Sequence, residues 1–240
     1  MKLSLHRFNG LYEVTLLCVL VAAQSARAVQ PVEIHAFPSP DFFPNGLVRG
    51  TNGDFYGTMH QTGPGGYGGI YELGANGAVT NLLTFGGTNG ADPKSRMILA
   101  SDGNFYGVTE TGGSSTNGTV FKLSPSGTLT TFAQFTGPNG SFPFGELIQG
   151  QDGNFYGATE AGGTMNTGTV FQVTASGALN TLFSFNGTDG ATPWAGLIQD
   201  ASGYLYGTTA YGGISNLGTI FRTTTNGSLT TLVSFTGNNG

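Results

Sequence analysis

Short apolar runs separated by glycine-containing turns make up most of the chain, and residues 146–195 show the pattern in full. Runs at 147–149, 154–159, 169–173 and 179–185 are rich in aliphatic, aromatic and β-branched residues, and a turn signal lies between each pair. Such runs with glycine-containing joins are typical of antiparallel hairpins. The pattern therefore predicts a four-stranded antiparallel meander.

The alternation of side chains indicates how this sheet is covered. Phe155 and Tyr156 are neighbours in the second predicted strand, so their rings point to opposite faces of the sheet. A sheet with one wet face would not keep an aromatic residue at both positions, so both faces are expected to be covered. The fourth predicted strand suits an outer, partly exposed position because it is rich in polar residues, namely Thr130, Thr131, Asn180, Thr181, Thr230 and Thr231. No helical periodicity runs through the chain.

The pattern repeats four times at a step of 50 residues, without insertion or deletion. Its marker is the hexapeptide at 52–57, 102–107, 152–157 and 202–207, which reads Asp-Gly-Asn-Phe-Tyr-Gly in the second and third copies. Repeats of about 50 residues with four strands each are typical of a β-propeller, and a β-solenoid is the alternative. The sequence therefore predicts an all-β fold of four propeller-type blades at 46–95, 96–145, 146–195 and 196–240, with a leading strand and linker at 29–45.

The first 28 residues have the features of an export signal. Lys2 and Arg7 give a basic start, an apolar run follows at 14–23, and Ala26-Arg27-Ala28 offers the small-x-small cleavage pattern. The run is shorter than the roughly 20 residues of a membrane-spanning helix. We therefore expect a cleaved signal peptide, no membrane span in the mature chain and a secreted or cell-surface location. Cys18, the only cysteine, leaves with the signal, so no disulfide is expected.

The charge balance disfavours some classes of partner. Beyond residue 28, five of the eight lysines and arginines remain, against twelve of the thirteen acidic residues. Nucleic acids and anionic membranes are bound through clustered Lys and Arg, so neither is an expected partner. The 42 glycines have no triplet period and alternate with apolar runs, which argues against collagen-like or disordered chains.

The combined pattern resembles the GloVer tandem repeat of Gloeobacter and Verrucomicrobia over residues 46–240. It joins Gly-x-x-Leu-Ile to Asp-Gly-Asn-Phe-Tyr-Gly-x-Thr-x-x-Gly-Gly, Gly-Thr-Val-Phe and Gly-x-Leu-x-Thr-Leu-x-x-Phe. The first copy departs most, with Asn52 for Asp and His60 at the end of the second predicted strand. The resemblance implies export and repeat architecture, and it carries no activity or catalytic residues to transfer.

Residues 32–37 resemble a fourth strand without the three strands that should precede it. We expect that the native product is longer and that the chain ends early at a repeat boundary. A closed ring of four blades with the extra strand on an edge is the alternative. An unpaired sheet edge would then favour self-association.

Candidate chemistry is sparse and falls at the loops. His60, Glu110, Glu160 and Ala210 occupy the same position at the end of the second strand of each repeat. One imidazole and two carboxylates around a channel mouth could hold a cation or act as acid and base on a glycan, although exposed polar residues where strands meet solvent are the simpler explanation because the ring members differ. The alternative candidates are loop aromatics suited to stacking on sugars or to packing between blades, namely Tyr67, Phe142, Phe144, Trp194 and Tyr211.

No cofactor and no metal site is expected. Asp102 and Asp152 precede glycine in predicted hairpins, where turn chemistry accounts for them. Beyond the signal only His35 and His60 remain, too few for a copper or zinc enzyme. The leading hypothesis is a secreted, non-catalytic interaction module for polysaccharide or a surface protein. A glycan-active propeller enzyme and a purely structural surface array are the alternatives.

Overall fold

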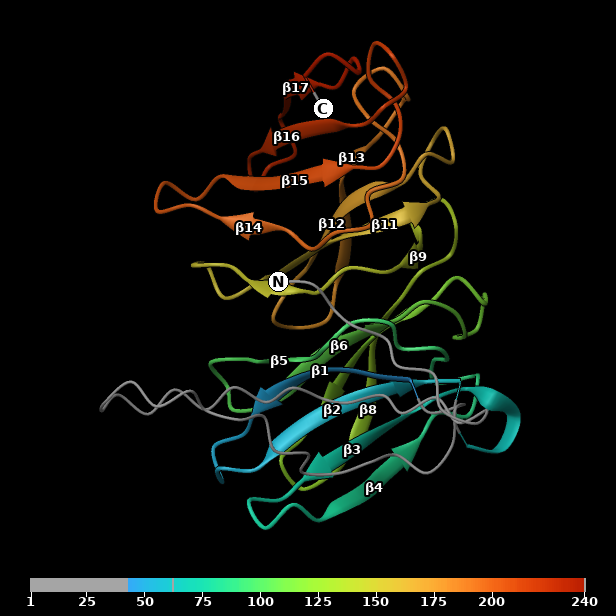
Figure 1. Ribbon diagram of the computed structural model, residues 1–240, viewed down its shortest axis with the longest axis vertical. Helices are drawn as coiled ribbons and strands as arrows, with labels where there is room; N and C mark the ends of the chain where they lie inside the picture. The colour runs from blue at the N-terminus through green and yellow to red at the C-terminus, as the bar shows by residue number, and fades with distance from the viewer. Residues whose placement is uncertain (1–42, 62, 240) are drawn as a thin grey trace, which may run out of the picture.

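The computed structural model describes residues 43–61 and 63–239 of the chain, which form four antiparallel sheets in sequence order (Figure 1). We call these sheets blades 1 to 4. Blade 1 contains β1 (Phe43–Arg49), β2 (Phe55–His60), β3 (Gly69–Leu73) and β4 (Val79–Thr84). Blade 2 contains β5 (Ile98–Leu99), β6 (Phe105–Thr109), β7 (Thr119–Leu123) and β8 (Leu129–Gln134). Blade 3 contains β10 (Ile148–Gln149), β11 (Phe155–Ala161), β12 (Thr169–Val173) and β13 (Leu179–Ser184). Blade 4 contains β14 (Ile198–Gln199), β15 (Leu205–Thr209), β16 (Thr219–Thr223) and β17 (Leu229–Ser234).

Each blade is a meander in which consecutive strands pair, as the pattern predicts. Blade 3 carries one further strand, β9 (Ser141–Pro143), which pairs with the end of β11. β1 begins at Phe43, inside the predicted linker, and is longer than the first strands of the other blades. The described part of the chain has a single helical segment, the short 3-10 turn η1 (Pro64–Gly66). The predicted leading strand at 32–37, the signal at 1–28 and Cys18 lie outside the described residues.

The last glycine of the hexapeptide makes room for an aromatic ring. Gly157 on β11 pairs with Phe171 on β12, and a Cβ built on Gly157 would lie 2.5 Å from Cζ of that ring. The equivalent pairs are Gly57 with Tyr71, Gly107 with Phe121, and Gly207 with Phe221. A side chain larger than hydrogen would displace each of these buried rings.

The first hexapeptide residue ties the turn to the sheet. The Asp152 carboxylate accepts the Asn154 backbone N–H at 3.2 Å and the Tyr156 hydroxyl at 2.7 Å. Asp102 accepts the same two groups from Asn104 and Tyr106. Turn chemistry therefore accounts for only part of the role of these aspartates, because each also accepts a hydrogen bond from the tyrosine of the following strand.

The two divergent repeats keep this anchor with other residues. In blade 4, Ser202 replaces the aspartate, and Asp200 accepts the Tyr206 hydroxyl at 2.9 Å instead. In blade 1, Asn52 donates to the Tyr56 hydroxyl oxygen at 2.9 Å, and that hydroxyl donates to Glu72 at 2.8 Å. The fixed element is the tyrosine hydroxyl, and the position of its partner varies.

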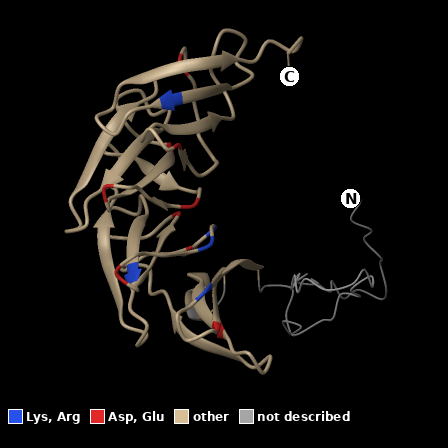
Figure 2. Ribbon diagram, turned by 90° about the vertical axis from the view of Figure 1, so that its left-hand side faces the viewer, with Lys and Arg blue, Asp and Glu red and all other residues tan. Residues whose placement is uncertain are grey.

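Successive blades pack face to face through three apolar clusters. At each junction a phenylalanine just after the fourth strand meets, nearly edge-on, a phenylalanine in the third strand of the next blade. The ring centroids are 5.4 Å apart for Phe85 and Phe121, 5.0 Å for Phe135 and Phe171, and 5.2 Å for Phe185 and Phe221. The stacked blades trace an open arc (Figure 2).

Burial follows the predicted two-sided cover for the inner blades. All residues of β6 and the first five of β11 are buried, whereas the equivalent β15 of blade 4 is open in its middle. The fourth strands β8, β13 and β17 are partly exposed, as their threonines and asparagines predict. Blade 4 is therefore covered on one face only among the described residues.

Candidate functional site

Equivalent segments at or just before the first strand of every blade line one groove, which lies on the concave side of the arc because all four blades contribute to it. The groove has a volume of about 460 Å³. Blade 1 contributes Asn45 and Gly46 to its wall, and the other blades contribute Lys94, Ser95 and Arg96, then Phe144, Gly145, Glu146 and Ile148, and finally Trp194, Gly196, Leu197 and Ile198. The same position of successive repeats, at a step of 50 residues, is occupied by Lys94, Phe144 and Trp194.

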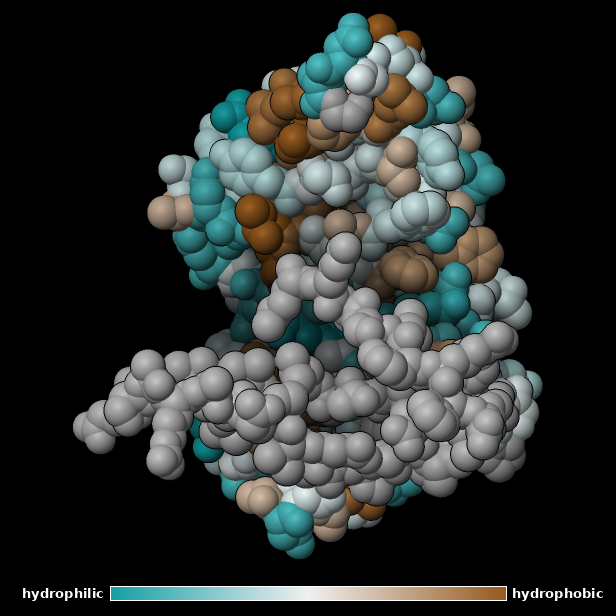
Figure 3. Space-filling model, viewed as in Figure 1, coloured by the Kyte–Doolittle hydropathy of each residue, from teal (hydrophilic) through white to brown (hydrophobic). Residues whose placement is uncertain are grey.

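Aromatic rings form one end of this groove. Trp194 is 46% exposed, and its ring meets Tyr211 edge-on at a centroid distance of 6.0 Å. Tyr211 is 49% exposed, and Phe144 is half-buried. Figure 3, which looks onto the concave side, shows hydrophobic surface over the upper two blades. Three of the predicted aromatic candidates therefore gather at one place.

The other two aromatic candidates lie elsewhere. Phe142 belongs to β9 with a positive φ of 57°, and its backbone N–H donates to the Asn117 carbonyl at 3.0 Å. Tyr67 is 40% exposed and lines a second cavity of about 620 Å³ together with Thr88, Asp92 and Thr111. Neither is among the residues that line the concave groove.

The charged side chains of the groove are paired with one another. Arg96 Nε lies 3.0 Å from Glu146 Oε2, which links blades 2 and 3 across the groove wall. Lys94 Nζ lies 3.2 Å from Asp92 Oδ2 and 3.0 Å from Glu110 Oε2. Both cations of the groove are therefore neutralised by carboxylates, so the wall presents little net charge to a ligand.

His60 and Glu110 belong to one polar cluster at the junction of blades 1 and 2. His60 Nδ1 faces Asp92 Oδ1 at 3.4 Å, and its ring stacks on Phe43 with 4.7 Å between centroids. Burial is the largest influence on the pKa of His60 and lowers it, against the attraction of Asp92. His60 and Glu110 are therefore connected only indirectly, through Asp92 and Lys94.

The remaining pKa shifts of this cluster follow from burial and ion pairing. Burial lowers the pKa of Lys94, but the hydrogen bonds and charges of Glu110 and Asp92 outweigh it, and the net shift is upward. Burial raises the pKa of Glu110, with the Lys94 hydrogen bond opposing it. Lys94, held between the two carboxylates, ties the connection between β4 and β5 to the end of β6 in blade 2. It would also have to be displaced before Glu110 could transfer a proton.

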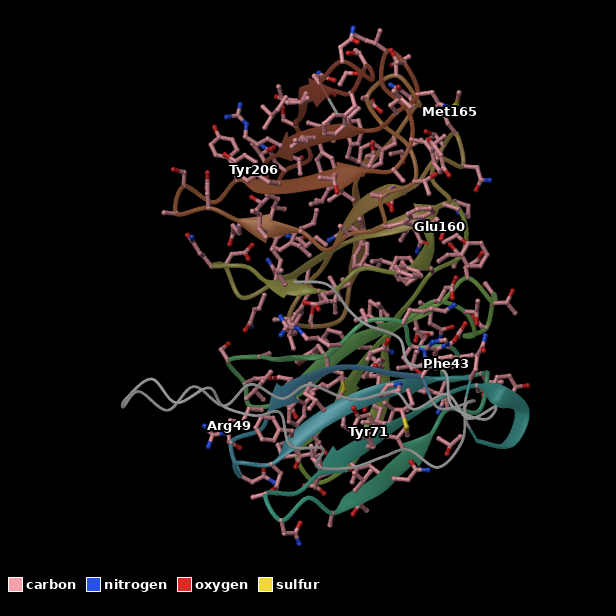
Figure 4. The ribbon with its side chains drawn as sticks, in the orientation of Figure 1. Phe43, Arg49, Tyr71, Glu160, Met165 and Tyr206 are labelled. Carbon is pink, nitrogen blue, oxygen red and sulfur yellow. The ribbon has the colours of Figure 1, made fainter. Side chains whose placement is uncertain are left out.

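Glu160 stands apart from this cluster. Figure 4 places it on the rim of blade 3, above the region of Phe43. Its side chain makes no hydrogen bond or ion pair with the described residues. Within residues 43–61 and 63–239, no group of three or more His, Cys, Asp and Glu side chains could hold a metal ion. The predicted ring of one imidazole and two carboxylates is therefore divided between two blade junctions.

The sequence-based choice of candidates missed the ion pairs. Lys94, Arg96 and Glu146 could have been found by aligning residues 44–46 with 94–96, 144–146 and 194–196, the same step of 50 residues that singled out His60, Glu110 and Glu160. Asn45 escaped for the same reason. Its side-chain amide donates to the Pro93 carbonyl at 2.7 Å and holds the first wall segment of the groove against the second.

The sequence model of the Gloeobacter/Verrucomicrobia repeat family matches residues 43–240, which include all four blades. The chain belongs to this repeat family. No match was found among curated proteins. The described residues of this GloVer-repeat chain contain no helix with the length and hydrophobicity that crossing a bilayer requires.

Solved structures share the propeller fold of this GloVer-repeat chain at low sequence identity. Virginiamycin B lyase from Staphylococcus aureus, determined with quinupristin, matches with a TM-score of 0.56 and 22% identity over 81% of this chain and 57% of its own. A gluconolactonase from Xanthomonas campestris matches with a TM-score of 0.53 and 16% identity over 79% of this chain and 61% of its own. The chain thus spans about three fifths of these propeller proteins. Similarity at this level shows a shared fold, and it does not transfer the activities of those proteins to this chain.

Proposed function

We propose that this chain is a non-catalytic binding module that holds a neutral polysaccharide in its concave groove. The observation that carries the proposal is the group of Trp194, Phe144 and Tyr211 in and beside a groove whose cations are already paired with carboxylates. Aromatic planes stack on the apolar faces of sugar rings, and paired charges leave no free cation to attract an anionic ligand.

The setting agrees with this role. The expected export signal would deliver the chain to the outside of the cell, where polysaccharides are abundant. The bridged carboxylates of Asp92 and Glu110 do not form an acid and base pair free to react. We therefore favour binding without turnover.

The test is affinity electrophoresis of the chain through gels that contain soluble dextran, mannan or mixed-linkage β-glucan. Stacking on Trp194 would remove roughly 100 Å² of apolar surface from water, worth about 2.5 kcal/mol before other costs. We therefore expect Trp194→Ala to weaken retardation by at least tenfold. Met165→Ala is the matched control, since Met165 is 64% exposed and lies outside the groove lining.

Two outcomes would contradict the proposal. If none of the three polysaccharides retards the chain, a neutral polysaccharide is not its ligand. Equal retardation of the wild-type chain and Trp194→Ala would move binding away from the groove. Release of reducing ends by the wild-type chain, abolished in Glu110→Gln, would instead favour a glycan-active enzyme.

A further inference from the structure

The segment that brings Trp194 into the groove begins at a residue with an unfavourable backbone conformation. Thr192 has a φ of 56°, in the left-handed region that a β-branched residue rarely adopts. Thr192 also precedes Pro193, and a residue before proline favours a φ of about −120°. The equivalent residues Phe142 and Asp92, which also precede prolines, have φ values of 57° and 60°. The chain therefore holds this position against its preference at each described blade junction.

Backbone hydrogen bonds to two neighbouring blades hold Thr192 in this conformation. Its N–H donates to the Thr167 carbonyl of blade 3 at 2.9 Å, and its carbonyl accepts the Ala210 N–H of blade 4 at 3.1 Å. Ala191 and Tyr211 exchange two more N–H···O bonds, of 2.8 and 3.0 Å. The Thr192 hydroxyl makes no hydrogen bond with the described residues. The conformation therefore depends on the backbone bonds.

Pro193 fixes the next step of the chain. Proline restricts its own φ to about −65°, and the Pro193 side chain is buried. A Cβ built on Gly168 would lie 2.7 Å from Pro193 Cδ, so the ring packs where a glycine leaves room for it. The same contact, at 2.6 Å, recurs at the other two junctions in the pairs Gly118 with Pro143 and Gly68 with Pro93.

Thr192, Pro193 and Gly168, which we call the bracket, set the position of two aromatic rings. Trp194 follows the bracket directly, and Tyr211 is hydrogen-bonded through its backbone to the residue that precedes Thr192. Both aromatic residues are exposed, so burial does not fix their rings. Their edge-on contact, with 6.0 Å between centroids, therefore depends on the backbone that carries them.

We propose that Pro193 is a positioning residue for polysaccharide binding, because with Thr192 it holds the Trp194 ring in its stacking position before a ligand arrives. A ring already in place loses little conformational freedom when a sugar stacks on it, and this favours binding. The consequence for binding rests on the proposed function. The placement of Trp194 itself is measured without a ligand.

Time-resolved fluorescence anisotropy of the purified chain tests this placement, because Trp194 is the only tryptophan. Pro193→Ala frees the φ of residue 193 and removes the ring that packs on Gly168. We expect the amplitude of the nanosecond component to rise about twofold. Pro93→Ala is the matched control, since it removes a buried proline in the same contact with Gly68 at the junction of blades 1 and 2. Both variants should lower the melting temperature, but only Pro193→Ala should free the tryptophan ring.

Two additions keep the test sharp. Should Pro193→Ala fail to fold, adding Thr192→Gly relieves the unfavourable φ, because glycine adopts positive φ without strain, and it leaves residue 193 free. Retardation in the polysaccharide gels is the second measurement. Pro193→Ala should weaken it about fivefold, the cost of immobilising one side chain on binding.

Three results would overturn the proposal. The anisotropy decay of a folded Pro193→Ala chain could match that of the wild-type chain. Pro93→Ala could free Trp194 to the same extent. Pro193→Ala could also free the ring and still be retarded as strongly as the wild-type chain. A wild-type chain that no polysaccharide retards would refute the proposed function and with it the role in binding, whereas the anisotropy comparison would still decide whether the bracket places Trp194.

Discussion

Replacing Gly157 by alanine tests the claim that the hexapeptide glycine exists to admit a ring. The new Cβ would lie 2.5 Å from Cζ and 2.9 Å from Cε1 of Phe171, and 3.1 Å from Cδ2 of Leu147. Ordinary carbon contacts begin near 3.4 Å, so the ring must move by about 1 Å. Phe171 and Leu147 are 0% and 1% exposed, and Phe135 packs on the ring from the preceding blade.

The cost can be bounded from these contacts. Overpacking of a core costs about 1–3 kcal/mol, and the loss of unfolded-state freedom on replacing glycine by alanine returns about 0.4–1 kcal/mol. Gly157 has no positive φ, so backbone strain does not add to the cost. We expect a net loss of about 2 kcal/mol in the free energy of unfolding, measured by urea titration followed by tyrosine fluorescence.

Two further variants make the test specific. Gly86→Ala is the control, because Gly86 is exposed, lacks a positive φ and has only Asn89 Oδ1 near its would-be Cβ, at 3.8 Å. It should leave stability within about 0.5 kcal/mol. Phe171→Leu shortens the side chain that faces position 157 and makes room for a new Cβ. The loss of unfolding free energy caused by Phe171→Leu should therefore be smaller by at least about 1 kcal/mol in the Gly157→Ala background than in the wild-type chain. A neutral Gly157→Ala, or an unchanged Phe171→Leu penalty, would refute the steric reasoning.

Two other predictions concern the turn aspartates. Burial raises the pKa of Asp102, but hydrogen bonds from Asn104, Lys122 and Tyr106 outweigh it and lower the pKa to about 2 from 3.8. Its contribution is therefore present above about pH 4 and lost as the pH falls towards 2. A shift of this size corresponds to about 2.4 kcal/mol, which we reduce to about 1 kcal/mol because the side chain is 42% exposed. The penalty of Asp102→Asn in urea unfolding should shrink by this amount between pH 6 and pH 2, and a pH-independent penalty would contradict the assignment. In blade 4, Asp200→Gly should lower the melting temperature by removing the Tyr206 partner, and adding Ser202→Asp should restore it; a swap that recovers nothing would show that the anchor is not transferable.

The strands could be predicted because their signals are local. The predicted run at 169–173 coincides with β12, and the run at 179–185 exceeds β13 by one residue. Turn glycines and alternating apolar residues fix such elements within a few neighbours. The strand β9 has no comparable signal in the sequence. One repeat earlier, the equivalent residue Ala91 forms only an isolated bridge to Thr111, so this pairing is not common to all the repeats.

The candidate site was harder to predict because its contacts join residues about 50 positions apart. Trp194, Phe144 and Tyr211 were recognised as exposed aromatics, but their gathering at one groove depends on how the blades stack. The ion pair of Arg96 with Glu146 likewise forms only when blade 3 lies against blade 2.

The near-identical junctions have a consequence for how the chain unfolds. When each unit contacts only its neighbours, stability is approximately a sum of unit terms and junction terms, and opening can begin at an end. Blade 4 has one junction among the described residues, whereas blades 2 and 3 have two. Amide hydrogens of β15 and β16 should therefore exchange with solvent before those of β6, β7, β11 and β12. The chain would lose its order from the end of the arc inward, one blade at a time.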